Sequence, residues 1–398
     1  MLAGFVLDFD GTAPALDDLR ALVDTRLAHI PSLHRRLPTT RTSGSPQPRP
    51  PEVEVHVREL SVGPADGLSR VLRHDLPDGD APPWDILLLR SDAGAPSRLC
   101  YRIHHSVQDG EGAAHTLAAL FGSGQAGPAP RTGLVPGPAG FVAVGAELIR
   151  SLRPADGWAA LRHPPTGLIS LRHADVSLDR LRRIARLHGV TVNDVHLAAL
   201  ARAFHRWRGR TGDDALRSPP LPVLVPMSVR RPGEEHTPGN RLVSLRVELP
   251  GAGSSAQQCL HDIRRQTAAA SRRAHRHASR IALAGLPVRL GARVALRAMN
   301  ANSTPVVASG TAFGGRLDCL GHGIRAAGMF SGLLPGLLSY VSLTRYGAVA
   351  RLTHVYDHAL PHGADVPLLW AASLADFEGH GHGGLPRPPA GHVPRRSA

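Results

Sequence analysis

The sequence of 398 residues contains no lysine, so all 46 of its basic residues are arginine. This absence excludes a Walker-type phosphate loop, a Schiff-base enzyme and the usual protein kinase, because each of them needs a lysine. Aromatic residues make up only 4% of the chain, although the formal net charge is +14. The 42 Gly and 35 Pro are typical of GC-rich codon usage, which favours arginine, so the charge alone indicates no nucleic-acid partner.

Cysteine is also scarce, with Cys100, Cys259 and Cys319 far apart and in no CxxC spacing. Neither a disulfide framework nor a cysteine-based zinc site is expected. No window holds 18 consecutive apolar residues, and residues 1–11 carry two aspartates and no basic start. We therefore expect a cytoplasmic protein with neither a transmembrane helix nor a secretory signal.

The pattern of apolar residues predicts strands alternating with helices in both halves of the chain. Expected strands cover residues 5–9, 53–57, 86–89, 99–103, 221–226 and 242–249, and expected helices cover 16–27, 178–187 and 192–207. Gly189 is placed to end a helix, and Thr191 with Asp194 forms a capping box for the next one. The composition divides the chain into an N-terminal lobe (1–121), a Gly/Pro-rich linker region (122–165), a C-terminal lobe (166–378) and a disordered tail (379–398).

The strongest functional signal is the segment HHSVQDG, residues 104–110, at the end of an expected strand. Asp109 and Gly110 are turn residues, and an amphipathic helix follows them. A histidine on such a loop is held rigidly and titrates near neutral pH, so His105 is suited to act as a general base. His104 points the other way by strand alternation, and Asp109 is suited to cap the helix or to pair with an arginine.

This segment resembles the HHxxxDG motif of the wax ester synthase/diacylglycerol acyltransferase family, within the superfamily of CoA-dependent acyltransferases and condensation domains. Further similarities follow in the family's order over about 350 residues. They are the opening strand and helix (7–37), Pro83-Trp84-Asp85-Ile86, Gly189-Val190-Thr191-Val192-Asn193-Asp194, Val225-Pro226-Met227-Ser228-Val229-Arg230, Gly239-Asn240-Arg241 and Leu338-Ser339-Tyr340.

The resemblance implies an α/β (α+β) fold of two chloramphenicol-acetyltransferase-like lobes, which form a pseudo-dimer around a central tunnel. It implies an acyltransferase that moves an acyl group from acyl-CoA to a hydroxyl acceptor such as a diacylglycerol or a fatty alcohol. The candidate catalytic residues are His105, His104 and Asp109, with Gly110 and Arg230 as structural residues of the site. Asp109 is expected to pair with Arg230, and neither a cofactor nor a metal is expected.

The sequence departs from the family where residues 309–313 replace an NVPGP-like loop without its asparagine or prolines, and residues 321–340 look shortened. The storage-lipid substrates therefore cannot be carried over. A condensation-like enzyme of natural-product biosynthesis, acting on a hydroxyl or amine with a CoA- or carrier-bound donor, stays open. So does a non-catalytic condensation-like binding module. The partners are acyl-CoA and a small-molecule or lipid acceptor, while a carrier protein and peripheral membrane contact stay open.

Three other patterns have less specific explanations. Asp8-Phe9-Asp10-Gly11-Thr12 imitates the DxDGT motif of haloacid-dehalogenase-like phosphatases, but a strand end followed by an Asp-Gly turn accounts for it. Histidines 380, 382 and 392 lie in a glycine-rich tail without preorganised metal geometry. Residues 281–299 form a basic amphipathic segment, which either packs on a lobe or touches anionic lipid.

Overall fold

The computed structural model describes residues 1–37, 51–63, 67–77, 81–91, 97–122, 153–155, 157–211, 219–230, 233–234, 239–270, 278, 281 and 301–379. Most of the predicted linker region (122–165), nearly all of the amphipathic segment at 281–299 and the tail beyond residue 379 lie outside these residues. Within them, no helix is long and apolar enough to cross a membrane. All three cysteines are buried and form no disulfide.

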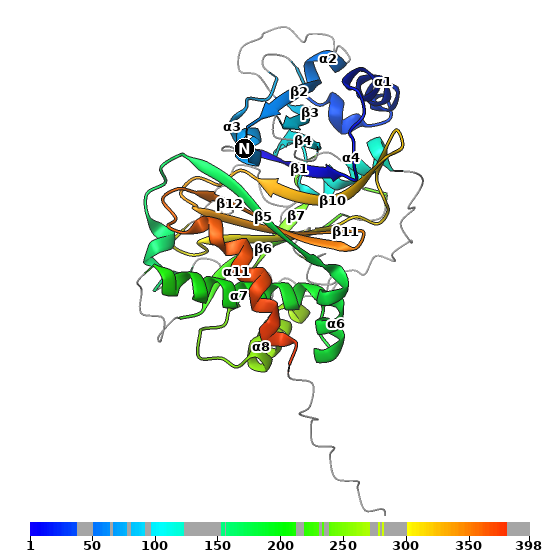
Figure 1. The fold of residues 1–398 in the computed structure, drawn as a ribbon. Coiled ribbons are helices and arrows are strands. Elements are labelled where there is room, and N and C mark those ends of the chain that lie inside the picture. Colours follow the sequence, from blue (N-terminus) through cyan, green and yellow to red (C-terminus); the bar gives the residue numbers. More distant parts are fainter. Residues whose placement is uncertain are drawn as a thin grey trace, which may run out of the picture.

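The described residues form two six-stranded sheets and the helices that pack on them (Figure 1). The first sheet has the order β2-β3-β4-β1-β10-β9. Its strands are β1 (Leu2–Phe9), β2 (Val57–Val62), β3 (Trp84–Ser91), β4 (Arg98–His104), β9 (Asp318–Cys319) and β10 (His322–Ser331). Its helices are α1 (Leu16–Leu27), α2 (Val53–His56), α3 (Arg70–Arg73) and α4 (Gly110–Phe121).

The second sheet has the order β5-β12-β11-β8-β6-β7. Its strands are β5 (Ile169–Ser177), β6 (Leu221–Ser228), β7 (Leu242–Leu249), β8 (Val306–Ala312), β11 (Ser339–Tyr346) and β12 (Val349–Asp357). Helices α6 (Leu178–His188), α7 (Val192–Arg210), α8 (Ala256–Ala270) and α11 (Val366–Ser373) cover the face of this sheet that points away from the first one (Figure 1). This mixed α/β architecture of two lobes is the fold class predicted from the sequence.

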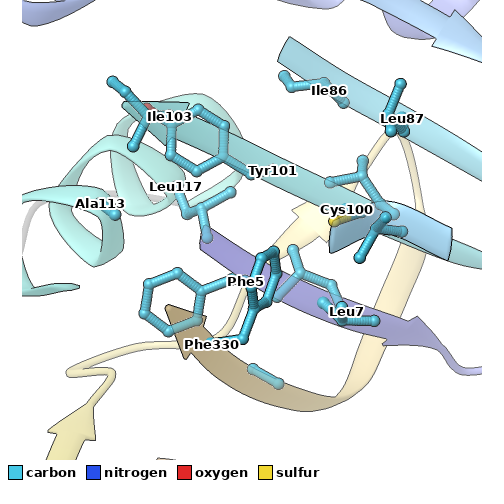
Figure 2. Packing of buried hydrophobic residues seen from close by; sticks show 14 of the residues in the cluster. Phe5, Leu7, Ile86, Leu87, Cys100, Tyr101, Ile103, Ala113, Leu117 and Phe330 are labelled. Carbon is cyan, nitrogen blue, oxygen red and sulfur yellow. The ribbon is translucent and has the colours of Figure 1, made fainter. Parts of the chain in front are cut away.

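Strand β10 links the two lobes. It lies in the range 166–378, which was predicted as the C-terminal lobe, but it pairs antiparallel with β1 of the first sheet, with Phe5 opposite Met329. Figure 2 shows how this strand adds to the first core: Phe330 of β10 lies with Phe5 of β1, close to Tyr101 of β4 and Leu117 of α4. The second core packs the inner face of α7 against the other sheet.

One predicted strand is wrong. The alternation of valines at 53–57 predicted a half-buried strand, but Val53–His56 forms a single helical turn and the strand begins only at Val57. The cause is His56, whose ring stacks on Trp84 with 4.2 Å between ring centroids and whose Nδ1 donates to the Trp84 carbonyl oxygen. This contact turns His56 inward and leaves Val55 exposed, so these two positions reverse the predicted alternation, whereas Val53 and Val57 are buried as it predicted.

A buried ion network joins the lobes between β1 and β12. The Asp8 carboxylate accepts a hydrogen bond from Nη2 of Arg351 at 2.6 Å and another from Nε of Arg98 at 3.0 Å. Arg351 also donates to Asp175 on β5. Burial tends to raise the pKa of Asp8, but the bond and the charge of Arg351 outweigh it and lower that pKa. Asp8 therefore stays ionised and fixes one sheet against the other.

Candidate active site

The site is built on the connection from β4 to α4, which carries both predicted histidines. Strand β4 ends at His104, and His105 follows in a turn. The backbone N–H of His105 donates to the carbonyl oxygen of Met1, so the turn remains attached to the start of β1. Strand β4 itself is anchored by a fully buried ion pair between Arg102 and Asp85 of the predicted Pro-Trp-Asp-Ile segment. The loop therefore follows a strand that is held in place by a hydrogen bond to β1 and by a buried ion pair.

His105 meets a residue of the other lobe. Its Nδ1 lies 3.0 Å from Oδ1 of Asn240. An amide oxygen only accepts hydrogen bonds, so this contact requires a proton on Nδ1 and leaves Nε2 with a free lone pair in the neutral ring. The arrangement prepares His105 to accept a proton at Nε2.

His104 has a different environment. Its Nδ1 lies 2.7 Å from Oγ of Ser106, and its Nε2 lies 3.0 Å from the backbone nitrogen of Met1. Burial of the ring lowers the pKa of His104. Both ring nitrogens are thus engaged by neighbours, and His104 is not among the residues that line the cavity described below.

Asp109 connects the loop to α4 and to the second lobe. It caps α4 by accepting a hydrogen bond from the Gly112 backbone N–H, and its two oxygens each lie 2.6 Å from Nη1 of Arg230. Oδ2 also accepts from the backbone N–H of Arg241. The side chains of this ion pair are 2% and 3% exposed, so the pair is almost sealed from solvent. The structure thus contains the contact predicted between Asp109 and Arg230.

The segment Gly239-Asn240-Arg241 attaches the second lobe to this loop at three points. In addition to the contacts of Asn240 and Arg241, the N–H of Gly239 donates to the carbonyl oxygen of Val107. From the sequence alone this segment was only a point of similarity, and no role was predicted for Asn240. Position along the chain does not show that Asn240 contacts His105, because the two are 135 residues apart.

Gly110 allows α4 to pack closely on β10. A Cβ at this position would overlap the end of the Met329 side chain. Met329 is held in turn by the Thr311 hydroxyl, which lies 3.2 Å from its sulfur. A larger side chain at position 110 would therefore displace part of the cavity wall.

A cavity of about 630 Å³ lies between the two sheets, and His105 is on its wall. The first lobe contributes the start of α4 and part of β10, and the second lobe contributes β6, β7, β8 and β11. The lining residues from these strands are mostly small or apolar, including Leu224, Pro226, Ser228, Leu242, Ser244, Val307, Ser309, Thr311, Met329, Ser331 and Tyr340. The space can therefore hold a small organic substrate beside the histidine.

Three further lining residues carry ionisable side chains: Tyr340, which belongs to a segment of family similarity, and Glu111 and Arg345, for which the sequence predicted no role. Tyr340 OH lies 2.7 Å from Oγ of Ser309, and burial raises the pKa of Tyr340 to about 12. Burial tends to raise the pKa of Glu111, but hydrogen bonds to His115 and Ser228 outweigh it and lower that pKa. Arg345 reaches the cavity from the end of β11.

The competing site patterns gain no geometric support. Asp8 is bound in the ion network between the sheets, whereas Asp10 is exposed, so the two aspartates do not converge on one pocket. Within the described residues, no three His, Cys, Asp or Glu side chains are gathered as metal ligands would be. Histidines 380, 382 and 392 lie outside those residues.

Comparison with known proteins gives no matching family model and no curated protein of similar sequence. Solved structures do match over almost the whole chain. The wax ester synthase/diacylglycerol acyltransferase from Marinobacter aquaeolei VT8 is 21% identical with a TM-score of 0.62, over 95% of this chain and 94% of that one. The first condensation domain of the CDA synthetase is 19% identical with a TM-score of 0.58, over 94% and 89%.

The starter condensation domain of the rhizomide synthetase, solved with C8-CoA and Leu-SNAC, is 13% identical with a TM-score of 0.59, over 94% of this chain and 86% of that one. These likenesses show that the chain has the two-lobe fold of wax ester synthases and condensation domains, as the sequence predicted. The tunnel and the roles of the site residues stay predictions.

Proposed function

We propose that the protein transfers an acyl group from an acyl thioester to a hydroxyl or amine acceptor, with His105 as the general base. The observation that carries this proposal is the contact of His105 Nδ1 with Asn240 Oδ1 on the wall of the cavity. It leaves Nε2 as the basic atom, in the state that proton abstraction requires.

In the proposed reaction, Nε2 takes the proton of the acceptor O–H or N–H while the acceptor atom attacks the thioester carbonyl carbon. The tetrahedral intermediate carries its negative charge on the former carbonyl oxygen. When it collapses, the C–S bond breaks and the thiolate takes the proton from the imidazolium, which yields an ester or an amide and a free thiol. The first step leaves His105 as the imidazolium, and the second step returns it to its neutral form.

The first turn of α4 is suited to stabilise the developing oxyanion. Gly110 and Glu111 belong to this turn and line the cavity. Backbone N–H groups in the first turn of a helix have no acceptor within the helix, and the positive end of the helix dipole lies there. Donors that are fixed before the reaction stabilise an oxyanion without a reorganisation cost. Asp109 and Arg230 act on the chemistry only by holding this turn in place.

The leading substrate pair is acyl-CoA with a hydroxyl acceptor such as a diacylglycerol or a fatty alcohol, as the resemblance implies. The cavity supports a second candidate as well. Polar side chains including Ser228, Ser244 and Ser309 stand among its apolar residues, which suits the polar acceptors of natural-product biosynthesis. A non-catalytic binding module is disfavoured, because an open cavity reaches His105.

Thiol release from a panel of acyl-CoAs, with mixed alcohol and amine acceptors, tests the proposal. His105→Ala should lower acceptor-dependent release by about 10² to 10⁴, the usual effect of losing a general base. His104→Ala, its neighbour with both ring nitrogens engaged, should have a smaller effect. Equal release by the wild type and His105→Ala would refute the proposed base. If the wild type releases no thiol, the same assay with acyl groups on a carrier protein separates a carrier-bound donor from a binding module.

A further inference from the structure

The cavity reaches beyond the space between the two sheets. Strands β6 and β8 pair parallel at only two positions, Val223–Val306 and Leu224–Val307, although both strands continue further. Past this point Met227 on β6 and Gly310 on β8 both line the cavity. The second sheet is therefore open between these strands, and the cavity can reach its helix-facing side there.

Two observations place Gly310 and Arg345 on that side. A Cβ built on Gly310 would lie 3.7 Å from Oδ1 of Asn193 in the first turn of α7. On β11, Ser342 and Thr344 both bond to the backbone of Met329 in β10, so the residues alternating with them face the helices. Arg345 is one of these alternating residues.

The charges near Arg345 agree with this placement. Burial lowers the pKa of Arg345, and the positive charge of Arg182 on α6 lowers it further. On α7, burial lowers the pKa of His196 to about 3, and the charge of Arg345 adds to the effect. The guanidinium of Arg345 therefore lies near α6 and α7, on the cavity wall.

Arg345 differs from the buried arginines that support the fold. Arg102, Arg230 and Arg351 each contact a carboxylate at 2.8 Å or less. For the half-buried guanidinium of Arg345, no described residue provides a hydrogen bond or an ion pair. A cation taken partly out of water without a partner is destabilising, and a bound anion would offset that cost. An anion can reach Arg345 from the cavity, because Arg345 lines it.

We propose that Arg345 binds an oxyanion, a carboxylate or a phosphate, carried by a substrate of this cavity. This inference rests on the proposed function, because it states which substrates the same site takes: those with an acidic group beyond the reacting carbonyl or hydroxyl. If the acid belongs to the acceptor, the inference favours the polar acceptors of the second candidate over a diacylglycerol or a fatty alcohol, which carry no acid. The planar guanidinium can donate two parallel N–H bonds to such a group. The acid belongs either to the acyl donor or to the acceptor.

Binding of simple anions tests the site without catalysis. Glutarate, its neutral diamide and inorganic phosphate are titrated calorimetrically into the wild type, Arg345→Gln and Arg182→Gln. Arg182→Gln is the matched control, because it removes an equal positive charge nearby. Arg182 is exposed and forms an ion pair with Asp179. We expect glutarate or phosphate, and not the diamide, to bind the wild type and Arg182→Gln, and Arg345→Gln to bind about 10 to 100 times more weakly. Absent binding, or equal affinity in Arg345→Gln, would overturn the inference.

Activity then identifies the source of the anion. Glutaryl-CoA is compared with pentanoyl-CoA as donor, and a hydroxy acid with its methyl ester as acceptor. Arg345→Gln should abolish the preference for the acidic member of one pair and leave the other pair unchanged. If neither preference changes, Arg345 does not select substrates. Anion binding that depends on Arg345, in a protein that transfers no acyl group to any acceptor, would refute the proposed function and leave the anion site standing.

Discussion

His105 and Asn240 contact each other across the boundary between the two lobes, with 3.0 Å between Nδ1 and Oδ1. His105 stands on the loop that leaves the first sheet, and Asn240 lies two residues before the start of β7 in the second. The second lobe thus determines which ring nitrogen of the proposed base carries the proton. Any change in how the lobes dock would alter the orientation of the ring.

Substitution of Asn240 should change catalysis more than stability. Asn240→Ala removes the acceptor that holds the ring, and we expect kcat/KM to fall about 10- to 100-fold, as for other residues that orient a functional histidine. Asn240→Asp places a carboxylate at the same point, which favours the charged imidazolium and should move the acidic limb of the pH–rate profile to higher pH. An unchanged profile in both variants would show that Asn240 does not act through His105.

The buried pair of Asp109 and Arg230 should be important for stability. Arg230→Met leaves the Asp109 carboxylate buried without its partner, and we expect a loss of about 3 to 5 kcal/mol in the free energy of unfolding. Arg210→Met is the matched control, because it breaks the exposed pair with Asp365, where a loss below about 1 kcal/mol is expected. Urea denaturation measures both. Similar losses in the two variants would contradict the structural role of the buried pair.

Local features of the fold were predictable because their causes lie within a few residues. The helix expected at 16–27 has those bounds, Gly189 ends α6 with a φ of 61°, and Thr191 and Asp194 form the predicted capping box. In each case the signal is a short-range hydrogen bond or an amphipathic repeat. The strand predicted at 53–57 was wrong because the stacking of His56 on Trp84, 28 residues away, outweighs the local alternation.

The assembled site was harder to predict. The loop of His105 and Asp109 could be located from its turn residues, and its pairing with Arg230 came from the resemblance. The proximity of Asn240 depends on how the second lobe docks, and the accessibility of Arg345 depends on the short pairing between β6 and β8. Neither relationship leaves a periodic signal in the sequence.

Acid should destabilise the protein below pH 6.5 through its buried histidines. Burial lowers the pKa of His196 to about 3 and that of His354 to about 4, so both stay neutral in the fold while the unfolded chain binds protons. The free energy of unfolding should therefore fall by about 1.4 kcal/mol per pH unit for each histidine as the pH drops from 6.5 towards 4.

His196→Phe isolates one of these contributions. No hydrogen bond to either ring nitrogen of His196 comes from a described residue, and the ring packs edge-on against Trp370. Phenylalanine can fill the same space without a titrating group. The free energy of unfolding of the variant should therefore depend on pH less steeply, by the contribution of one histidine. Unfolding curves at several pH values measure this slope. An unchanged slope would mean that His196 is protonated to the same extent in both states.

The last prediction concerns Gly110 and the cavity wall. A Cβ on Gly110 would overlap the flexible end of Met329, whereas a Cβ on Gly4 would overlap the Tyr101 backbone oxygen. Because a methionine side chain can move and a sheet backbone cannot, Gly110→Ala should lower the unfolding free energy by about 1 to 3 kcal/mol and Gly4→Ala by more. Since Met329 also lines the cavity, Gly110→Ala should raise KM as well. In a Met329→Ala background Gly110→Ala should cost less, so a double-mutant cycle with strictly additive effects would contradict the predicted overlap.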